Sequence, residues 1–134
     1  MIDEGLKKWL IKAFEDYRTI ENEFKLPKEE MVTTTICFHA QQFVEKMLKS
    51  YLYSKGIEFG RTHNLELLIK LCSQIDKSFS KLNVGNLSDY AIEVRYPDNF
   101  YIPTLEEARR SFEIAQDVKE FVLEKLGIKE DEIR

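Results

Sequence analysis

Hydrophobic residues along the 134-residue chain recur at intervals of three, four and seven positions, and no segment alternates with a period of two. Such spacing is typical of amphipathic α-helices, whereas half-buried strands alternate. The pattern predicts five helices, over residues 3–25, 28–55, 64–81, 86–96 and 104–126. The predicted loops are short, which favours antiparallel neighbours. We therefore expect an all-α, up-and-down bundle of about five helices that forms a single domain, residues 1–134.

Helix-start and helix-stop residues mark several of these boundaries. Pro27 cannot continue a helix but suits the first turn of a new one. Gly56 and Gly127 are typical of the position that follows a helix. Thr104 and Glu107 have the spacing of a capping box, which predicts the start of the last helix. The apolar stripe of that helix is so wide that we expect either deep burial or a partner.

Composition and charge narrow the class of protein. Hydrophobic residues make up 43% of the chain and charged residues 33%, as in a globular domain that can form its own core. The formal net charge is −4. This balance disfavours a protein that coats nucleic acid by charge alone, because such binding needs many Lys and Arg residues on one face. A local basic pocket is compatible with it.

The two cysteines and the lack of long apolar runs predict that the protein is located in the cytoplasm. Cys37 and Cys72 both fall on predicted apolar helix faces, so we interpret them as reduced core residues and not as a disulfide or metal ligands. The N-terminus has no apolar region like that of a signal peptide, and no run approaches the ~18 apolar residues of a membrane span. We expect a soluble, cytoplasmic protein without membrane contact.

The first candidate site lies on the second predicted helix. His39, Gln42 and Lys46 fall on one helical stripe, beside the apolar face. They offer two hydrogen-bonding groups and one charge to a nucleotide or to a partner carboxylate. The alternative is a solvated edge of a packed helix, since helix borders are usually polar.

The second candidate is His63, which with Arg61 precedes the third predicted helix. Unpaired N–H groups at a helix N-terminus attract anions, so a phosphate could bind there. The alternative is simple capping of that helix.

The third candidate is the stretch EVRYPDNFYIPT, residues 93–104, the least helix-like part of the chain. The guanidinium of Arg95 could hold a phosphate through two hydrogen bonds. The rings of Tyr96, Phe100 and Tyr101 could stack on bases. Asp98 could instead neutralise Arg95 within the loop. The alternative is that Arg95 interacts favourably with the negative end of a helix dipole and that the aromatic rings cover the end of the bundle.

Sequence motifs for other chemistry are missing. The chain has only two histidines, no Gly-rich phosphate loop, and neither a Cys-x-x-Cys nor a His-Glu-x-x-His pair. We therefore predict no metal site and no cofactor.

Two passages together resemble the HEPN domain family. Residues 37–72 contain HAQQFVEKMLKSYL followed by THNLELLI, and residues 93–122 contain RYP followed by a threonine-capped helix. The resemblance implies a bundle of about five helices that often forms a homodimer. It also implies a possible partner, because such domains are commonly encoded beside, or fused to, a minimal nucleotidyltransferase, often as a toxin–antitoxin system. Many family members are metal-independent ribonucleases, and others bind nucleotides or act as non-catalytic partners.

The chain departs from the nuclease pattern at one position. In the nucleases of the family an arginine is followed a few residues later by a histidine, and two copies meet at the dimer interface. Arg95 matches that arginine, but Phe100, Tyr101 and Ile102 stand where the histidine would be. Histidine exchanges protons near neutral pH, whereas a tyrosine with a pKa near 10 is a poor general base.

These residues leave three functions open. The first is a non-catalytic HEPN module that binds nucleotide or RNA, or pairs with a nucleotidyltransferase, as a homodimer. The second is a diverged ribonuclease that uses Arg95, with Tyr101, Asp98 or a histidine from elsewhere in the fold. The third is a structural partner that assembles through the apolar stripe of the last helix.

Overall fold

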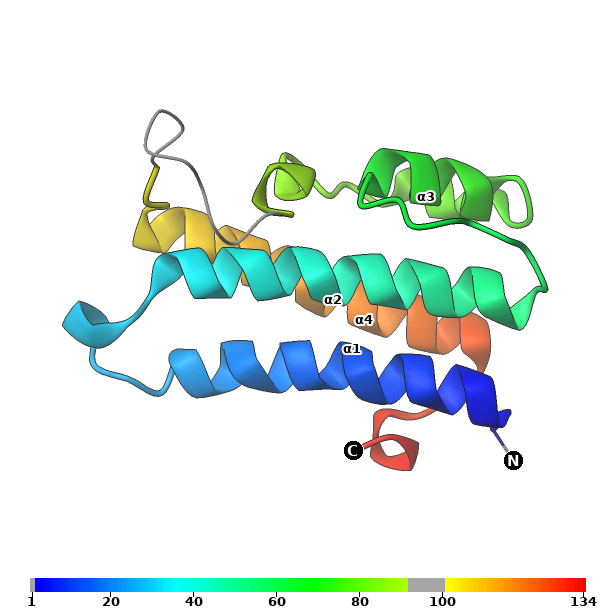
Figure 1. Ribbon diagram of the computed structural model, residues 1–134, viewed down its shortest axis with the longest axis horizontal. Coiled ribbons are helices and arrows are strands. Elements are labelled where there is room, and N and C mark those ends of the chain that lie inside the picture. Colours follow the sequence, from blue (N-terminus) through cyan, green and yellow to red (C-terminus); the bar gives the residue numbers. More distant parts are fainter. Residues whose placement is uncertain (1, 92–100) are drawn as a thin grey trace.

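The computed structural model describes residues 2–91 and 101–134 of the chain (Figure 1). These residues form α-helices and short 3-10 helices and contain no strand. The α-helices are α1 (Glu4–Glu23), α2 (Thr33–Ser54), α3 (Leu65–Ser73) and α4 (Leu105–Leu126). The 3-10 helices are η1 (Lys28–Glu30), η2 (Lys77–Lys81), η3 (Leu87–Tyr90) and η5 (Glu130–Glu132). The predicted all-α bundle is confirmed.

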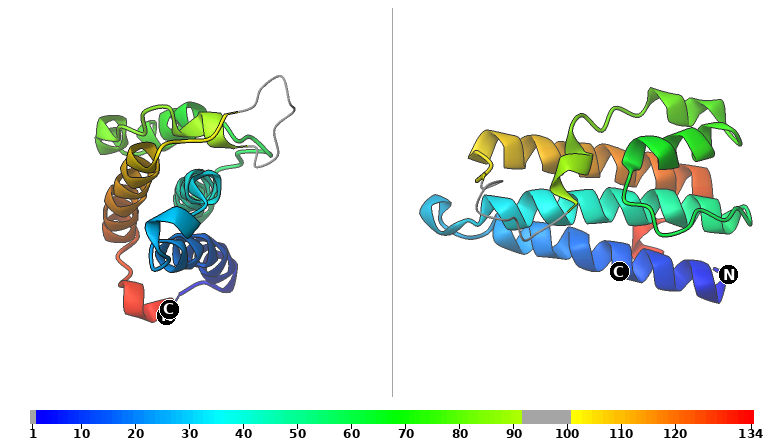
Figure 2. Two further views of the ribbon diagram at one scale, coloured as in Figure 1. Left: turned by 90° about the vertical axis from the view of Figure 1, so that its left-hand side faces the viewer. Right: turned by 45° about the horizontal axis from the view of Figure 1, so that its top comes forward.

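Helix α2 lies at the centre of the bundle, and α1, α3 and α4 pack against different sides of it (Figure 2). It runs antiparallel to α1, as the short connection after α1 predicts (Figure 1). Helix α4 instead runs in the same direction as α2. The Thr33 hydroxyl, at the start of α2, donates a hydrogen bond to the Pro103 carbonyl just before α4, at 2.6 Å. Helix α4 therefore begins at the end of the bundle where α2 begins.

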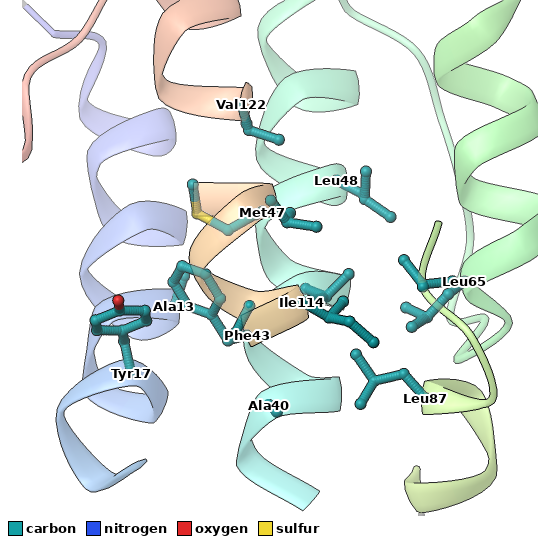
Figure 3. Packing of buried hydrophobic residues seen from close by; sticks show 14 of the residues in the cluster. Ala13, Tyr17, Ala40, Phe43, Met47, Leu48, Leu65, Leu87, Ile114 and Val122 are labelled. Carbon is teal, nitrogen blue, oxygen red and sulfur yellow. The ribbon is translucent and has the colours of Figure 1, made fainter. Parts of the chain in front are cut away.

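The core follows from this central position of α2. Of its 22 residues, 13 are buried, and they contact side chains from all the neighbouring elements (Figure 3). Phe43 is fully buried and packs its ring against Phe14 and Tyr17 of α1. The core therefore depends on one helix that is covered on nearly every side.

The wide apolar stripe of α4 is covered within the chain. Phe112 packs against Tyr17 of α1 and against Phe24, which directly follows α1. Phe121 packs edge-on against Phe79 of η2. The wide stripe is therefore explained, among the described residues, by burial within the chain.

Two predicted helices are longer than the observed ones. The helix predicted over 28–55 begins at Thr33, because Val32 is extended and donates its N–H to the Glu23 carboxylate at 2.8 Å. The helix predicted over 64–81 ends at Ser73. There the Asp76 carboxylate accepts hydrogen bonds from the Ser78 N–H and hydroxyl, and this local turn competes with the helix.

The helix predicted over 86–96 is a single 3-10 turn, Leu87–Tyr90, in its described part, and residues 92–100 lie outside the described residues. The last predicted helix is confirmed as α4. Its capping box is present at Thr104 and Glu107, and Gly127 ends it with a left-handed φ of 69°. After Gly127 the chain turns back toward α1 (Figure 2).

Both cysteines are free and buried, as predicted. In the described ranges, no helix has the length and apolar character needed to cross a membrane.

Candidate functional site

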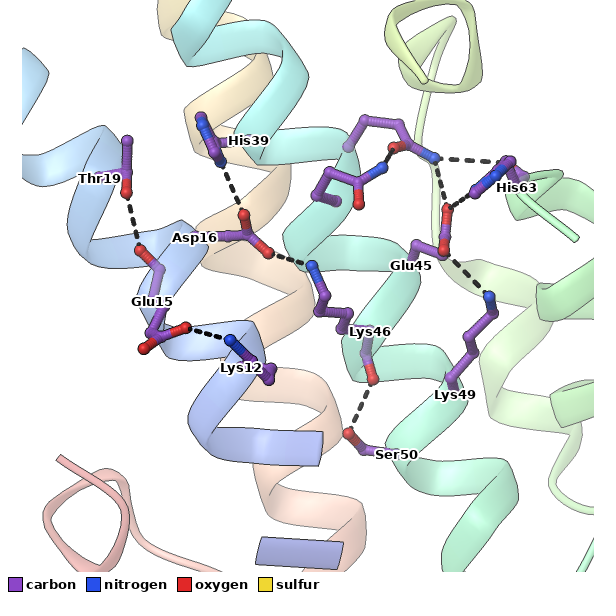
Figure 4. A network of polar contacts seen from close by, with 12 residues as sticks. Lys12, Glu15, Asp16, Thr19, His39, Glu45, Lys46, Lys49, Ser50 and His63 are labelled. Carbon is purple, nitrogen blue, oxygen red and sulfur yellow. Dashed lines mark hydrogen bonds and ion pairs between the residues drawn. The ribbon is translucent and has the colours of Figure 1, made fainter. Parts of the chain in front are cut away.

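Helix α2 carries a stripe of polar residues between α1 and the loop that precedes α3 (Figure 4). His39, Gln42 and Lys46 lie on this stripe, as their spacing predicts, and are only partly buried. The positions between them are buried. The predicted polar edge of the helix is therefore a partly exposed stripe along the middle of α2, flanked by buried positions.

Asp16 of α1 joins two of these residues. Its carboxylate lies 2.6 Å from His39 Nδ1 through one oxygen and accepts a hydrogen bond from Lys46 Nζ at 2.6 Å through the other. Asp16 is only 7% exposed. A carboxylate this buried needs charged or hydrogen-bonding partners, and His39 and Lys46 supply them.

Glu45 forms a matching group on the other side of α2. Its carboxylate lies 2.9 Å from His63 Nδ1 and accepts hydrogen bonds from Lys49 Nζ at 3.0 Å and from the buried Gln41 amide at 3.2 Å. Burial alone raises the pKa of Glu45, but the hydrogen bonds from His63, Lys49 and Gln41 outweigh it, so the pKa is lowered. Glu45 is therefore ionised at neutral pH.

The two groups lie side by side on α2, and Gln42 belongs to the Glu45 group. The Gln42 amide donates a hydrogen bond to the Gln41 side-chain oxygen at 2.8 Å. We call the two groups together the α2 polar face. It comprises Asp16, His39, Gln41, Gln42, Glu45, Lys46, Lys49 and His63.

The chemistry available on the α2 polar face is binding and proton exchange. A carboxylate at Nδ1 fixes the orientation of a histidine ring and leaves Nε2 for another group. In the described part of the chain, neither histidine is hydrogen-bonded to a serine, threonine or cysteine that could act as a nucleophile. Within the same ranges no three His, Cys, Asp or Glu residues are grouped to hold a metal ion.

Tyr101 lies at a different place, at the start of α4. Its hydroxyl donates to one oxygen of Glu107, and the Tyr90 hydroxyl donates to the other oxygen at 2.8 Å. Glu107 also caps α4 through the Thr104 N–H. The hydrogen bond to Glu107 raises the pKa of Tyr101. Burial, and in addition the hydrogen bond to Glu107, raises the pKa of Tyr90. Both tyrosines therefore keep their protons at neutral pH.

Two adjoining cavities open beside this cluster, with volumes of about 280 and 370 Å³. Both are lined by Asn86, Tyr90 and Glu107, so they flank the same carboxylate. Arg110 lines the first cavity and Tyr101 the second. The start of α4 thus offers space for a ligand group beside two aromatic rings.

The structure brings some predicted site residues together and leaves others undescribed. His39, Gln42, Lys46 and His63 share the α2 polar face, although they came from two separate predictions. Arg95, Tyr96 and Asp98 lie outside the described residues. No described contact tests their predicted role.

Sequence reasoning missed the carboxylates that organise these sites. Asp16 stands three residues after Ala13 and four before Ile20, within the apolar stripe of α1. An acidic residue at such a position signals a buried partner on a neighbouring helix. Glu45 gave no comparable signal, because Gln41, Gln42 and Lys49 stand one helical turn away from it. Glu107 was predicted as part of the capping box but not as the partner of two tyrosines.

Comparison with known proteins identifies the domain type. The model of the HEPN domain family matches residues 6–126 of this chain. No curated protein and no solved structure matches it.

Proposed function

Because the chain belongs to the HEPN domain family over residues 6–126, we propose that it is a non-catalytic helical module that binds nucleotide or RNA. We further propose that it works in the cytoplasm as a homodimer and pairs with a minimal nucleotidyltransferase, in the manner of a toxin–antitoxin system. Arg95 is the proposed phosphate-binding residue, with Tyr96 and Asp98 beside it.

One observation carries the non-catalytic part of this proposal. Tyr101, at the position of the nuclease histidine, donates a hydrogen bond to Glu107, and this bond raises the pKa of its hydroxyl. Both histidines of the chain are bound to carboxylates of α1 and α2 instead. RNA cleavage without a metal needs a group that accepts the proton of the ribose 2′-hydroxyl near neutral pH. A tyrosine with a raised pKa does not accept a proton at that pH.

Binding is tested with labelled nucleotides and a short RNA. We expect Arg95→Ala to weaken binding about tenfold, because a charged hydrogen bond to phosphate contributes on the order of 1.5–3 kcal/mol. Arg109→Ala is the matched control, since Arg109 is an exposed arginine of α4. Equal affinity of the wild type and Arg95→Ala, or no binding by either, would contradict the ligand assignment.

Catalysis is tested separately with structured RNA and no divalent metal. We expect the purified wild type to leave the RNA intact. The second candidate, a diverged ribonuclease, is favoured only by the Tyr101–Glu107 pair, in which a half-exposed hydroxyl is aligned with a carboxylate. It predicts cleavage that both Arg95→Ala and Tyr101→Phe abolish.

Pairing is tested by co-expression with the product of the neighbouring gene, if that gene encodes a minimal nucleotidyltransferase. We expect the two proteins to co-purify and to sediment as one complex. Separate sedimentation at micromolar concentrations would contradict the pairing but would leave the nucleotide result unaffected.

A further inference from the structure

Residues 128–134, which we call the strap, lie across α1 after the chain turns at Gly127 (Figure 2). The family match ends at residue 126, so the strap lies outside the matched residues. Ile128 and Ile133 are partly buried against the core. The strap therefore covers part of the domain that would otherwise face solvent.

Arg134 makes the main contacts of the strap with α1. It donates a hydrogen bond from Nη2 to the Glu21 carboxylate at 2.6 Å. Its guanidinium carbon lies 5.8 Å from the ring centroids of both Phe14 and Tyr17. A carboxylate beside two aromatic rings matches a guanidinium in both charge and shape.

An acidic residue of the strap completes the fit. Glu130 lies 2.8 Å from Lys119 Nζ of α4 and accepts a hydrogen bond from Arg134 Nη1 at 3.2 Å. Lys119 Nζ is itself 4.9 Å from the Tyr17 ring centroid. Phe14, Tyr17, Glu21 and Lys119 thus form a surface, here the strap surface, that is complementary to an acidic turn followed by an arginine.

The contacts that hold the strap are individually weak. The side chains of Arg134 and Glu21 are 22% and 35% exposed, and that of Glu130 is 34% exposed. Ion pairs with this much solvent contact stabilise a structure only weakly, and salt weakens them further. Gly127 has a left-handed φ, so one residue sets the direction in which the strap leaves α4. Local opening of the strap therefore requires little free energy compared with unfolding the domain.

We propose that the strap surface is a recognition site for an acidic turn that ends in an arginine, and that a second copy of this chain supplies its own strap to it by exchange. The strap is the segment that the structure shows to fit this surface. Fully extended, it spans roughly 20 Å, enough to reach a neighbouring copy whose strap surface faces it. The exchange holds whether or not the chain binds nucleotide.

The experiment uses the 134-residue Arg134→Gln chain labelled with ¹⁵N, in which the strap loses its guanidinium. A peptide of residues 127–134 is titrated to millimolar concentration. This concentration is needed because the chain's own tethered strap has an effective concentration in the millimolar range and competes with the peptide. We expect amide shifts at Phe14, Tyr17, Glu21 and Lys119, with an affinity at least tenfold higher than for the wild-type chain. The same peptide with its arginine replaced by glutamine should cause no shifts.

The second arm replaces the peptide with unlabelled wild-type chain. Exchange predicts that the same amides of the labelled Arg134→Gln chain move toward their wild-type positions as the unlabelled chain is added. Labelled Arg109→Gln chain is the matched control and should not respond, because its own strap is intact. Peptide binding without a response to the intact chain would overturn the exchange, and no peptide binding would overturn the recognition site itself.

Discussion

Glu107 links the candidate ligand-binding end of the bundle to the stability of α4. It accepts hydrogen bonds from two tyrosine hydroxyls and from the Thr104 N–H, so one carboxylate both orients the rings and caps the helix. The hydrogen bond from Tyr101, opposed by burial and joined by that from Tyr90, lowers the pKa of Glu107. The two aromatic rings are therefore held beside the cavities by an ionised group.

We expect Glu107→Ala to lower the free energy of unfolding by about 1–2 kcal/mol, because the capping box and the bond from Tyr90 are lost together. Urea denaturation at pH 7 measures this change. Glu106→Ala is the matched control, since Glu106 is an exposed residue of the same helical turn. Equal effects of the two substitutions would contradict the role given to Glu107.

Glu45 predicts a dependence of stability on pH. Its pKa in the folded chain lies below the ordinary 4.5. Its contribution is therefore complete above pH 4.5 and is lost as the pH falls through the lowered value. We expect Glu45→Gln to lower the free energy of unfolding by about 3 kcal/mol at pH 7, because Lys49 is left buried without its partner.

Urea denaturation at pH 7 and at pH 3 checks the sign of this effect. The difference between the wild type and Glu45→Gln should be smaller at pH 3 than at pH 7, because the stabilising effect of the carboxylate begins to be lost below the ordinary pKa of 4.5. The exposed Glu124, changed to Gln, serves as the control at both values. A difference that stays constant with pH would rule out the ionic role of Glu45.

At the scale of the elements, α4 shows which boundaries a sequence can predict. Its start and its end depend on local features, the Thr104 capping box and the left-handed Gly127, and both were predictable. The end of α3 was not, because the apolar spacing continues to Phe79 while the Asp76 side chain turns the chain. Hydrophobic spacing describes burial and says little about polar side chains that compete with the helix.

The same distinction applies to the candidate site. The stripe of His39, Gln42 and Lys46 could be predicted, since spacing on one helix determines it. Asp16 could not be assigned as their partner, because it comes from another helix and the pairing depends on how α1 packs on α2. The role of Arg95 stays a prediction.

We expect Gly127→Ala to destabilise the chain by about 1 kcal/mol, since φ at this position is 69° and alanine is strained there. Thermal and urea unfolding measure the change. Gln116→Ala, at an exposed position inside α4, should have no destabilising effect. Unchanged stability of Gly127→Ala would show that the turn tolerates a side chain.

At the scale of the whole molecule, α2 joins α1, α3 and α4 into one bundle. The thiols of Cys37 and Cys72 are fully buried, and Cys37 lies on α2 while Cys72 lies on α3. Burial raises the pKa of both, that of Cys72 to about 12. Neither thiol is therefore nucleophilic in the folded chain.

We expect both thiols to react with a disulfide reagent only when the bundle opens. At pH 8 the native chain should react about a thousandfold or more slowly than the chain in urea, in line with the small unfolded fraction of a stable domain. Rapid reaction of one thiol in the native chain would show that its helix opens independently of the rest.

The parallel arrangement of α2 and α4 also determines how the chain can fold. Helices α1 and α2 contact each other as soon as residues up to 54 are available, since a short connection joins them. The bond between Thr33 and Pro103 joins residues 70 positions apart, so α4 docks only after a long loop has closed. The contacts of α4 thus raise the contact order of the chain, and the rate of folding should depend on how fast α4 docks onto α1 and α2. Until then, the aromatic side of α1 and α2 that α4 covers stays exposed to other chains and to chaperones.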